Sequence, residues 1–352
     1  NSTSASDLTS GTLADARFPA TLPAISGANL TNLPAGGATS INGLTDGYNA
    51  GNSVGLGTGA LANDDGTTNV NTAVGTNTLN STTSGSYNTA IGFKALTANT
   101  TGTYNTASGN YALIANTTGI RNTASGSYAL RSNTTGTNNV AAGYGALNSN
   151  TTASYNTANG FYSLYANTTG TYNTASGMYA LKSNTTGYQN TASGYSALKL
   201  NTTGTNNVAS GSKALQNNTT GNNNVASGYQ ALFSNTTGYN NTAYGYTAMQ
   251  DNTTGINNTA SGMYALQNNT TGTLNTASGW YSLYANTSGT KNIGLGSGAG
   301  DAITTGSNNT IIGDYAGTTT LANTVVIAAG TTERLKIDAS GMQVNGTALT
   351  GI

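Results

Sequence analysis

Histidine and cysteine are absent from this chain of 352 residues, and charged side chains make up only 6% of it. Without these two residue types, zinc, haem and iron–sulfur centres lose their usual ligands, and acid–base or thiol catalysis loses its usual groups. A disulfide framework is excluded as well. We therefore predict a protein that is not an enzyme, with no catalytic residue, no metal site and no cofactor.

The few charges balance, with 10 Lys and Arg against 10 Asp and Glu. This balance gives no expectation of nucleic acid or an anionic membrane surface as a partner, because both need clustered cations. No apolar run approaches the roughly 20 residues that span a bilayer, so we predict no membrane span. The chain starts at Asn1 without a visible signal peptide, and we expect a processed piece of a longer precursor.

The chain does contain a regular repeat of 17 residues. Its most constant member is an Asn that recurs without insertion at Asn71, Asn88, Asn105, Asn122, Asn139, Asn156, Asn173, Asn190, Asn207, Asn224, Asn241, Asn258, Asn275, Asn292 and Asn309. A disordered linker has no physical reason to keep such a period. A stack of coils does, because one extra residue would break the alignment of every ladder above it.

Numbered from this Asn, the unit reads N-T-A-S-G-x-Y-A-L-x-x-N-T-T-G-x-x. Ala at position 3 and Leu (Met249 in one unit) at position 9 are the predicted buried residues. We expect the Asn side chains to bond to the Asn of the coils above and below, and the Tyr rings to stack. One Leu and two Ala give each coil a thin interior, which favours association with other chains.

This unit predicts an all-β protein, a parallel β-solenoid with one coil per repeat and a rise of about 4.8 Å. Helical repeats need 33 residues or more, so 17 are too few. The N-T-A-x-G segment suits a short strand, and N-T-T-G suits a turn in which Asn and Gly take positive φ. The Y-A-L segment fits either a second short strand or one helical turn, and we favour a strand or an extended corner.

Three segments follow from the pattern. Residues 1–48 hold all three prolines and spaced apolar residues such as Leu8, Phe18 and Leu33, which predicts an extended lead-in outside the solenoid. Residues 49–328 form the solenoid, and residues 329–352 form a cap with a β-hairpin around Ala339–Gly341. The lead-in has too few residues to enclose its own apolar side chains, so we predict a parallel homotrimer around a common axis.

Units such as Asn88-Thr89-Ala90-Ile91-Gly92 resemble the head repeats of trimeric autotransporter adhesins, over about residues 50–328. The N-T-A-x-G and N-T-T-G arrays also resemble phage tail-fibre-like and bacterial surface proteins. The Leu8–Pro34 segment is similar to their lead-in, and Arg334–Gly346 to the hairpin before their endosialidase-type intramolecular chaperone. This resemblance implies a trimeric fibre.

Three short motifs carry weaker alternatives. The Gly-rich Gly294–Gly298 segment lacks the Lys-Ser/Thr pair of a phosphate loop. Asp64-Asp65-Gly66 is typical of a solvated turn more than of a calcium site, which needs six or more oxygen ligands. The Asn-Thr-Thr triplets match glycosylation sequons, although we interpret them first as turn chemistry.

Aromatic residues form the candidate binding stripe. Its members are Tyr111, Tyr128, Tyr162, Tyr179, Tyr264 and Tyr281, with Tyr144, Tyr195, Tyr229, Tyr246 and Trp280 beside them. Such a ladder can stack on sugars or on another protein. Packing between coils or chains is the competing interpretation, and we favour it over ligand binding.

Two hypotheses of function remain. The first is a structural one: an extracellular fibre, surface filament or adhesin stalk, with a cell-surface glycan or protein as a partner and self-association into trimers or filaments. A virion tail fibre and a cell-surface filament both fit this class. The alternative is ice binding by a Thr-rich β-solenoid, for which N-T-A offers one outward rank of Thr where ice binders usually need two.

Overall fold

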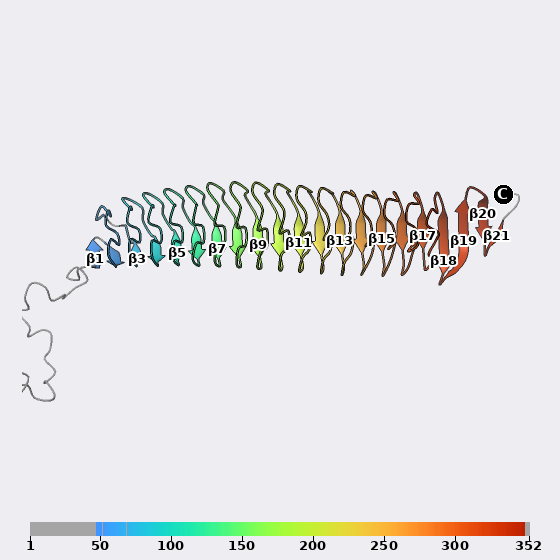
Figure 1. The fold of residues 1–352 in the computed structure, drawn as a ribbon, viewed down its shortest axis with the longest axis horizontal. Helices are drawn as coiled ribbons and strands as arrows, with labels where there is room; N and C mark the ends of the chain where they lie inside the picture. The colour runs from blue at the N-terminus through green and yellow to red at the C-terminus, as the bar shows by residue number, and fades with distance from the viewer. Residues whose placement is uncertain (1–46, 51, 68, 349–352) are drawn as a thin grey trace, which may run out of the picture. The chain divides into compact units, whose positions relative to one another are not determined.

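The computed structural model describes residues 47–50, 52–67 and 69–348, and these form one continuous solenoid of short strands (Figure 1). The described residues contain no helix. The strands are β1 Gly47–Ala50, β2 Ser53–Leu56, β3 Thr72–Val74, β4 Thr89–Ile91, β5 Thr106–Ser108, β6 Thr123–Ser125, β7 Val140–Ala142, β8 Thr157–Asn159, β9 Thr174–Ser176, β10 Thr191–Ser193, β11 Val208–Ser210, β12 Val225–Ser227, β13 Thr242–Tyr244, β14 Thr259–Ser261, β15 Thr276–Ser278, β16 Ile293–Leu295, β17 Thr310–Ile312, β18 Val325–Ala329, β19 Thr332–Asp338, β20 Gly341–Val344 and β21 Thr347–Ala348.

The strands β2 to β18 stack in parallel, each pairing with the strand of the next coil, so the predicted parallel β-solenoid is confirmed. In the regular part, each residue pairs with the residue 17 positions later, as Ala107 does with Ala124. The step is 18 residues at the first coil, where Val54 pairs with Thr72. It is 15 at the last, where Thr310 pairs with Val325. The strict period is thus a property of the inner coils.

The strand of each coil covers positions 2 to 4 and alternates exposed, buried, exposed, as in Thr106-Ala107-Ser108. Only a small side chain fits at position 3, because the strand packs directly across the narrow interior. Ala at positions 3 and 8 and Leu at position 9 have no exposed surface in the inner coils. The predicted core residues are confirmed, and the single chain already encloses them.

The Y-A-L segment is neither the strand or extended corner that we favoured nor a helical turn; it forms tight turns. Tyr111 and Leu113 both take positive φ, 59° and 51°, and so do their counterparts in most coils. The Ala112 N–H donates to the Gly109 carbonyl, and the Asn116 N–H to the Leu113 carbonyl, which closes two successive turns. Left-handed backbone costs roughly 1–3 kcal/mol at a non-glycine residue. Hydrogen bonds to the neighbouring coils, such as Leu113 N–H to the Ala129 carbonyl, hold it in place.

The Asn at position 1 forms the predicted ladder, and it does so inside the protein. The Oδ1 of Asn105 accepts from the backbone N–H of Asn122 at 3.0 Å and from its Nδ2 at 3.2 Å. The Nδ2 of Asn105 also donates to the Gly119 carbonyl of its own coil at 2.8 Å. Each amide has hydrogen-bond partners in its own coil and in the adjacent ones. These polar groups can therefore be buried without the free-energy cost of an unpaired donor or acceptor.

A second Asn ladder runs through position 12, the Asn of N-T-T-G. The chain bends at the two Thr of this motif, as predicted, but its Asn and Gly do not take the positive φ that we expected. Asn116 is fully buried, and its Nδ2 donates to Oδ1 of Asn99 at 2.9 Å and to the Gly119 carbonyl at 3.1 Å. Gly119 does not take positive φ. It is glycine because a Cβ there would lie 2.3 Å from Oδ1 of Asn116 and 2.5 Å from the Gly136 carbonyl oxygen.

The last coils fill the same cross-section with aliphatic side chains. The Leu file ends at Leu283, and position 9 of the next coil is Gly300. Ile303 replaces the Asn of position 12, and Ile311 replaces the Ala of position 3, both fully buried. A Cβ at Gly300 would lie 3.2 Å from Cδ1 of Ile303 and 3.6 Å from Cγ1 of Ile311. The two isoleucines therefore take up the volume that the missing leucine leaves.

Antiparallel strands cover both edges of the parallel sheet. At the first edge β1 pairs with β2, and at the last edge β19 pairs with β18 and is followed by β20 and β21. Asp338 pairs with Gly341, so β19 and β20 form the hairpin expected around Ala339–Gly341. Uncovered parallel edges would be templates for further pairing. The lead-in predicted for residues 1–48 lies, up to residue 46, outside the described residues.

Candidate ligand-binding face

Positions 6, 7 and 10 of successive coils form the aromatic side of the solenoid. The turns described above position them, with the side chain of position 7 outside the coil and that of position 9 inside it. Tyr111 and Tyr128 lie in adjacent coils and stack with ring centroids 5.3 Å apart and planes at 6°. Tyr162 and Tyr179 follow at 6.4 Å, and Tyr264 and Tyr281 at 4.8 Å. The predicted stacking of Tyr rings is present.

The predicted stripe is not continuous. Tyr179 and Tyr264 are separated by four coils that carry Ser196, Lys213, Gln230 and Thr247 at position 7. The residues placed beside the stripe lie at position 6, and they bridge neighbouring coils, as Tyr144 does with Phe161 at 5.6 Å. A further aromatic file at position 17, with Tyr87 stacked on Tyr104 at 5.0 Å, was not predicted. The aromatic residues therefore form several clusters.

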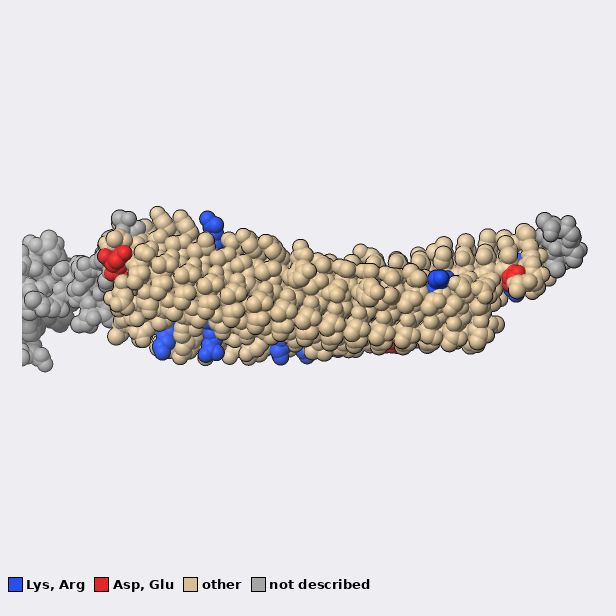
Figure 2. Space-filling view, turned by 90° about the horizontal axis from the view of Figure 1, so that it is seen from above, with Lys and Arg blue, Asp and Glu red and all other residues tan. Residues whose placement is uncertain are grey.

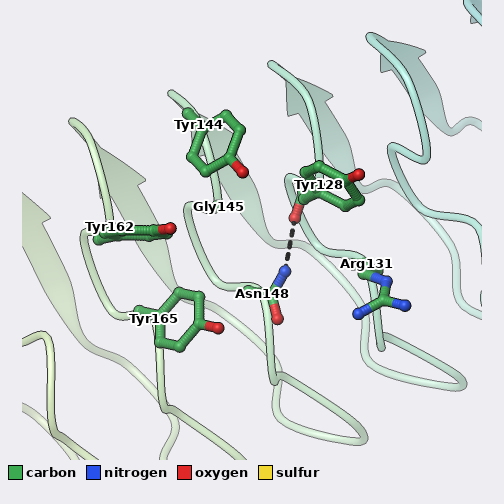
Figure 3. Close-up of a pocket in the computed structure, with 7 residues that line it drawn as sticks. All are labelled: Tyr128, Arg131, Tyr144, Gly145, Asn148, Tyr162 and Tyr165. Carbon is green, nitrogen blue, oxygen red and sulfur yellow. Dashed lines mark hydrogen bonds between the residues drawn. The ribbon is translucent and has the colours of Figure 1, made fainter.

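The first cluster contains a pocket of about 300 Å³ (Figure 3). Gly145 occupies position 7, where the coils on either side carry Tyr128 and Tyr162, so one ring is missing from the file. The Tyr162 ring leans into the gap, since a Cβ on Gly145 would lie 2.7 Å from it. The pocket is lined by Tyr128, Arg131, Tyr144, Gly145, Asn148, Tyr162 and Tyr165.

Polar groups of this pocket are held in defined positions. The Asn148 Nδ2 donates to the Tyr128 carbonyl at 3.2 Å, which fixes the amide at the floor between two coils (Figure 3). The Tyr162 ring packs edge-on against Tyr165 at 4.7 Å and against Tyr144 at 5.5 Å. Partial burial raises the pKa of the Tyr162 hydroxyl above its ordinary 10.0, and Tyr144 adds to this effect. Tyr162 is therefore a neutral hydrogen-bonding group at physiological pH.

Cations accompany these rings. Arg131 lies 5.7 Å from the Tyr128 ring centre, Lys182 lies 5.3 Å from that of Tyr179, and Lys94 lies 5.3 Å from that of Phe93. Figure 2 shows blue side chains gathered along one edge of the first half of the solenoid. Each ring that carries a nearby cation offers both a flat apolar surface and a positive charge.

A second aromatic cluster lies near the other end and has the opposite charge. Trp280 lies 4.5 Å from Tyr281, which lies 4.7 Å from Tyr284. The adjacent coil carries Asp301 at position 10, where the first cluster has Arg131. Burial raises the pKa of the Asp301 carboxyl, and the nearby Asp314 raises it further. An anionic ligand would be repelled from this cluster.

The strand side of the solenoid carries the one outward Thr rank that we expected, and a rank of mainly Ser lies beside it. Position 2 supplies mainly Thr, and position 4 supplies Ser in many inner coils, as in Thr191 and Ser193. Towards the ends, position 4 becomes apolar and exposed, with Val74 and Ile91 at one end and Leu295, Ile312 and Ile327 at the other. Tyr244 interrupts the Ser rank near the middle.

The weaker motifs have structural roles. The Asp64 and Asp65 carboxylates accept bonds from Gly66, Thr67 and Asn69 within one turn. Gly294 lies in β16 and so in the solenoid wall. Asn of the Asn-Thr-Thr triplets is buried from Asn99 to Asn286, which leaves no room for a glycan on the folded chain.

Within the part of the chain that the structure describes, no group of three or more acidic residues could hold a metal ion. Over the same residues, no helix has the length and apolar character needed to cross a membrane.

Comparison with known proteins gives no match to a family model, a curated protein or a solved structure. The structure defines the protein as a parallel β-solenoid with 17-residue coils. The resemblance to trimeric adhesin heads and phage tail fibres stays a prediction.

Proposed function

We propose that this protein is a structural, non-enzymatic segment of an extracellular fibre or surface filament, and that its aromatic side binds surface glycans. The unbroken register from Asn71 to Asn309 supports this proposal best. Backbone bonds and two Asn ladders join every coil to the next, so bending or stretching must distort many bonds at once. At about 4.8 Å per coil, the fourteen steps between these residues span about 67 Å.

We further propose that three chains associate in parallel through the strand side. Its side chains are mostly small. Its exposed apolar residues lie at the two ends and, with Val140, Val208 and Tyr244, in the middle. Association there would bury Val74, Ile91, Leu295 and Ile312 and would leave the aromatic side outward. The described coils enclose their own interior, so the thin interior no longer favours a trimer. The strand side and the predicted lead-in are what support it.

The mass of the native protein, measured by light scattering, tests the assembly. We expect a trimer, and we expect Ser210→Glu in β11 to dissociate it by placing like charges around the axis. The matched control is Thr220→Glu in the exposed turn of the same coil, which should leave the trimer intact. A monomer, an antiparallel dimer, or equal effects of both substitutions would contradict the shared-axis assembly.

The two outward ranks of the strand side favour ice binding as a second candidate. Thr and Ser at positions 2 and 4 repeat with the coil spacing on this surface. The same surface cannot be both buried in a trimer and open to ice, so the two functions exclude each other. Thermal hysteresis of the native protein should be zero for the fibre, and a clear hysteresis gap that Ser210→Glu abolishes would favour the ice binder.

A further inference from the structure

The overall charge balance hides a strong segregation along the chain. Residues 66–250 contain six cations, namely Lys94, Arg121, Arg131, Lys182, Lys199 and Lys213, and no Asp or Glu. Acidic residues occur before and after this segment. Since no acidic side chain lies within these coils, their cations are available to a ligand.

Five of these six cations lie on the aromatic side. Lys94 and Lys213 occupy position 7, and Arg131, Lys182 and Lys199 occupy position 10. We call positions 6, 7 and 10 of the coils from Asn88 to Asn207 the basic aromatic face. It also contains Tyr111, Tyr128, Tyr144, Phe161, Tyr162, Tyr165, Tyr179 and Tyr195. Only Arg121 lies elsewhere, at position 17, over the Tyr104 ring.

We infer that the basic aromatic face binds a linear acidic polysaccharide along the solenoid axis, with one sugar ring seated in the Gly145 pocket. This inference rests on the proposed glycan-binding role of the aromatic side and names its ligand class. It is independent of the trimer.

Geometry favours a linear glycan. The rise of one coil is close to the length of one sugar unit in an extended chain, so successive sugars meet successive coils. The Gly145 pocket provides the aromatic walls of Tyr128 and Tyr162 for the apolar face of a sugar ring, and the Tyr144 and Tyr165 hydroxyls for its oxygens. Arg131 lies at one side of the pocket, where it can pair with a carboxylate or sulfate (Figure 3).

Charge spacing favours an acidic glycan over a nucleic acid. The first and last coils of this face, which begin at Asn88 and Asn207, are seven coil steps apart, or about 34 Å. The face carries five cations over this length, which is one cation per about 7 Å. A nucleic-acid strand in a helix carries one phosphate per about 3.4 Å, and half of these would lack a partner. A polysaccharide with an acid on every or every second sugar matches this spacing more closely.

Binding of the full chain to four polymers tests the inference: polygalacturonate for carboxylates, dextran sulfate for sulfates, dextran as the neutral glycan, and oligo(dT) as single-stranded DNA. Affinity electrophoresis or calorimetry measures each. We expect at least one acidic glycan to bind at least tenfold more tightly than dextran and oligo(dT), and we expect that binding to weaken in 1 M salt. The preference between the two acidic glycans identifies the anionic group.

Three variants locate the site. Gly145→Tyr fills the pocket with the residue that neighbouring coils carry at the same φ, 61° at Tyr128 against 63° at Gly145. The Tyr162 ring, which would lie 2.7 Å from the new Cβ, must swing aside, and circular dichroism of the variant checks that the coil still folds. Arg131→Gln removes the charge at the pocket, and the double variant Lys182→Gln/Lys199→Gln removes two charges beyond it. Each should weaken acidic-glycan binding roughly tenfold. Arg121→Gln, a cation of the same segment on another side, is the matched control and should bind as the native protein does.

Several results would overturn the inference. If dextran bound as tightly as the acidic glycans, the glycan-binding role would stand and the acidic ligand would be wrong. Tighter binding of oligo(dT) would make the ligand a nucleic acid. If no glycan bound, or if Arg121→Gln weakened binding as much as Arg131→Gln, the basic aromatic face would have no such role. The mass of the native protein would still test the proposed trimer independently of glycan binding.

Discussion

The inner coils and the last two coils enclose the same cross-section with different chemistry. The inner coils place two Asn side chains, two Ala and one Leu inside each turn, whereas the last coils use Ile303, Ile311 and Val326. An amide ladder satisfies every rung only while the next rung is also an amide. Where it ends, Asn286 faces Ile303, and its Oδ1 is buried without a hydrogen-bond partner. The ladder therefore stabilises the inner coils, whereas its last amide destabilises the fold by burying an unpaired oxygen.

The largest expected effect comes from cutting the ladder in its interior. Asn201→Leu would leave Oδ1 of Asn184 without its donor and one N–H of Asn218 without its acceptor, two bonds that are now 2.8 Å long. Two orphaned groups at about 1–3 kcal/mol each predict a loss of about 4 kcal/mol. Hydrogen exchange of the amides in this and the neighbouring coils would measure the local loss.

Asn286→Leu is the matched control for this substitution. It would orphan Oδ1 of Asn269 but remove the existing orphan on Asn286, so the net change in free energy should be near zero. If Asn201→Leu and Asn286→Leu lowered the stability equally, the hydrogen bonds of the amides would not contribute to it. The proposed difference between the inner coils and the last coils would then be wrong.

An intermediate effect is expected from converting the last coils to the inner pattern. Gly300→Leu alone should clash with Leu283, whose Cδ2 would lie 2.8 Å from the new Cβ, and with Ile303, whose Cδ1 would lie 3.2 Å from it. Ile303→Asn alone should leave a cavity beside Gly300, and each substitution should cost about 2 kcal/mol. The double variant restores both residues of the inner coils, including a partner for Oδ1 of Asn286. Thermal unfolding should show coupling of about 1–3 kcal/mol between the two sites. If the two losses of stability were strictly additive, Ile303 would not fill the volume that Leu fills in the inner coils.

The smallest effect is the pH dependence that Asp301 gives to the last coils. Burial, with Asp314 nearby, raises the pKa of Asp301 above its ordinary 3.8, so the folded chain binds this proton more tightly than the unfolded chain. The free energy of unfolding should therefore rise as pH falls from neutrality to about 3.8. Hydrogen bonds from Ser340 and Thr67 lower the pKa values of Asp338 and Asp65, which act in the opposite direction.

Asp301→Asn isolates that contribution. It should stabilise the last coils slightly at neutral pH and remove their gain on acidification, as measured by hydrogen exchange at pH 7 and pH 4.5. An unchanged pH profile in the variant would show that Asp301 does not carry the effect.

Sequence alone was sufficient for the period, the strand at positions 2 to 4, the Ala and Leu interior and the Asn ladder, because each depends on one residue type recurring at one spacing. It was insufficient for the turns. Asn116 and Tyr111 follow no local rule, since their conformations depend on bonds to the coils above and below. The Gly145 pocket left one signal that we did not use: a glycine in a file of tyrosines.

The strict register also determines how such a protein can change in length. Adding or removing a whole unit between Asn88 and Asn275 leaves every amide, every Gly contact and both covered edges as they are, whereas an insertion of another size among these coils would interrupt both Asn ladders. A gene built of near-identical repeats gains and loses whole copies during replication. The length of this solenoid is therefore a quantity that inheritance can adjust in steps of one coil, without a new fold.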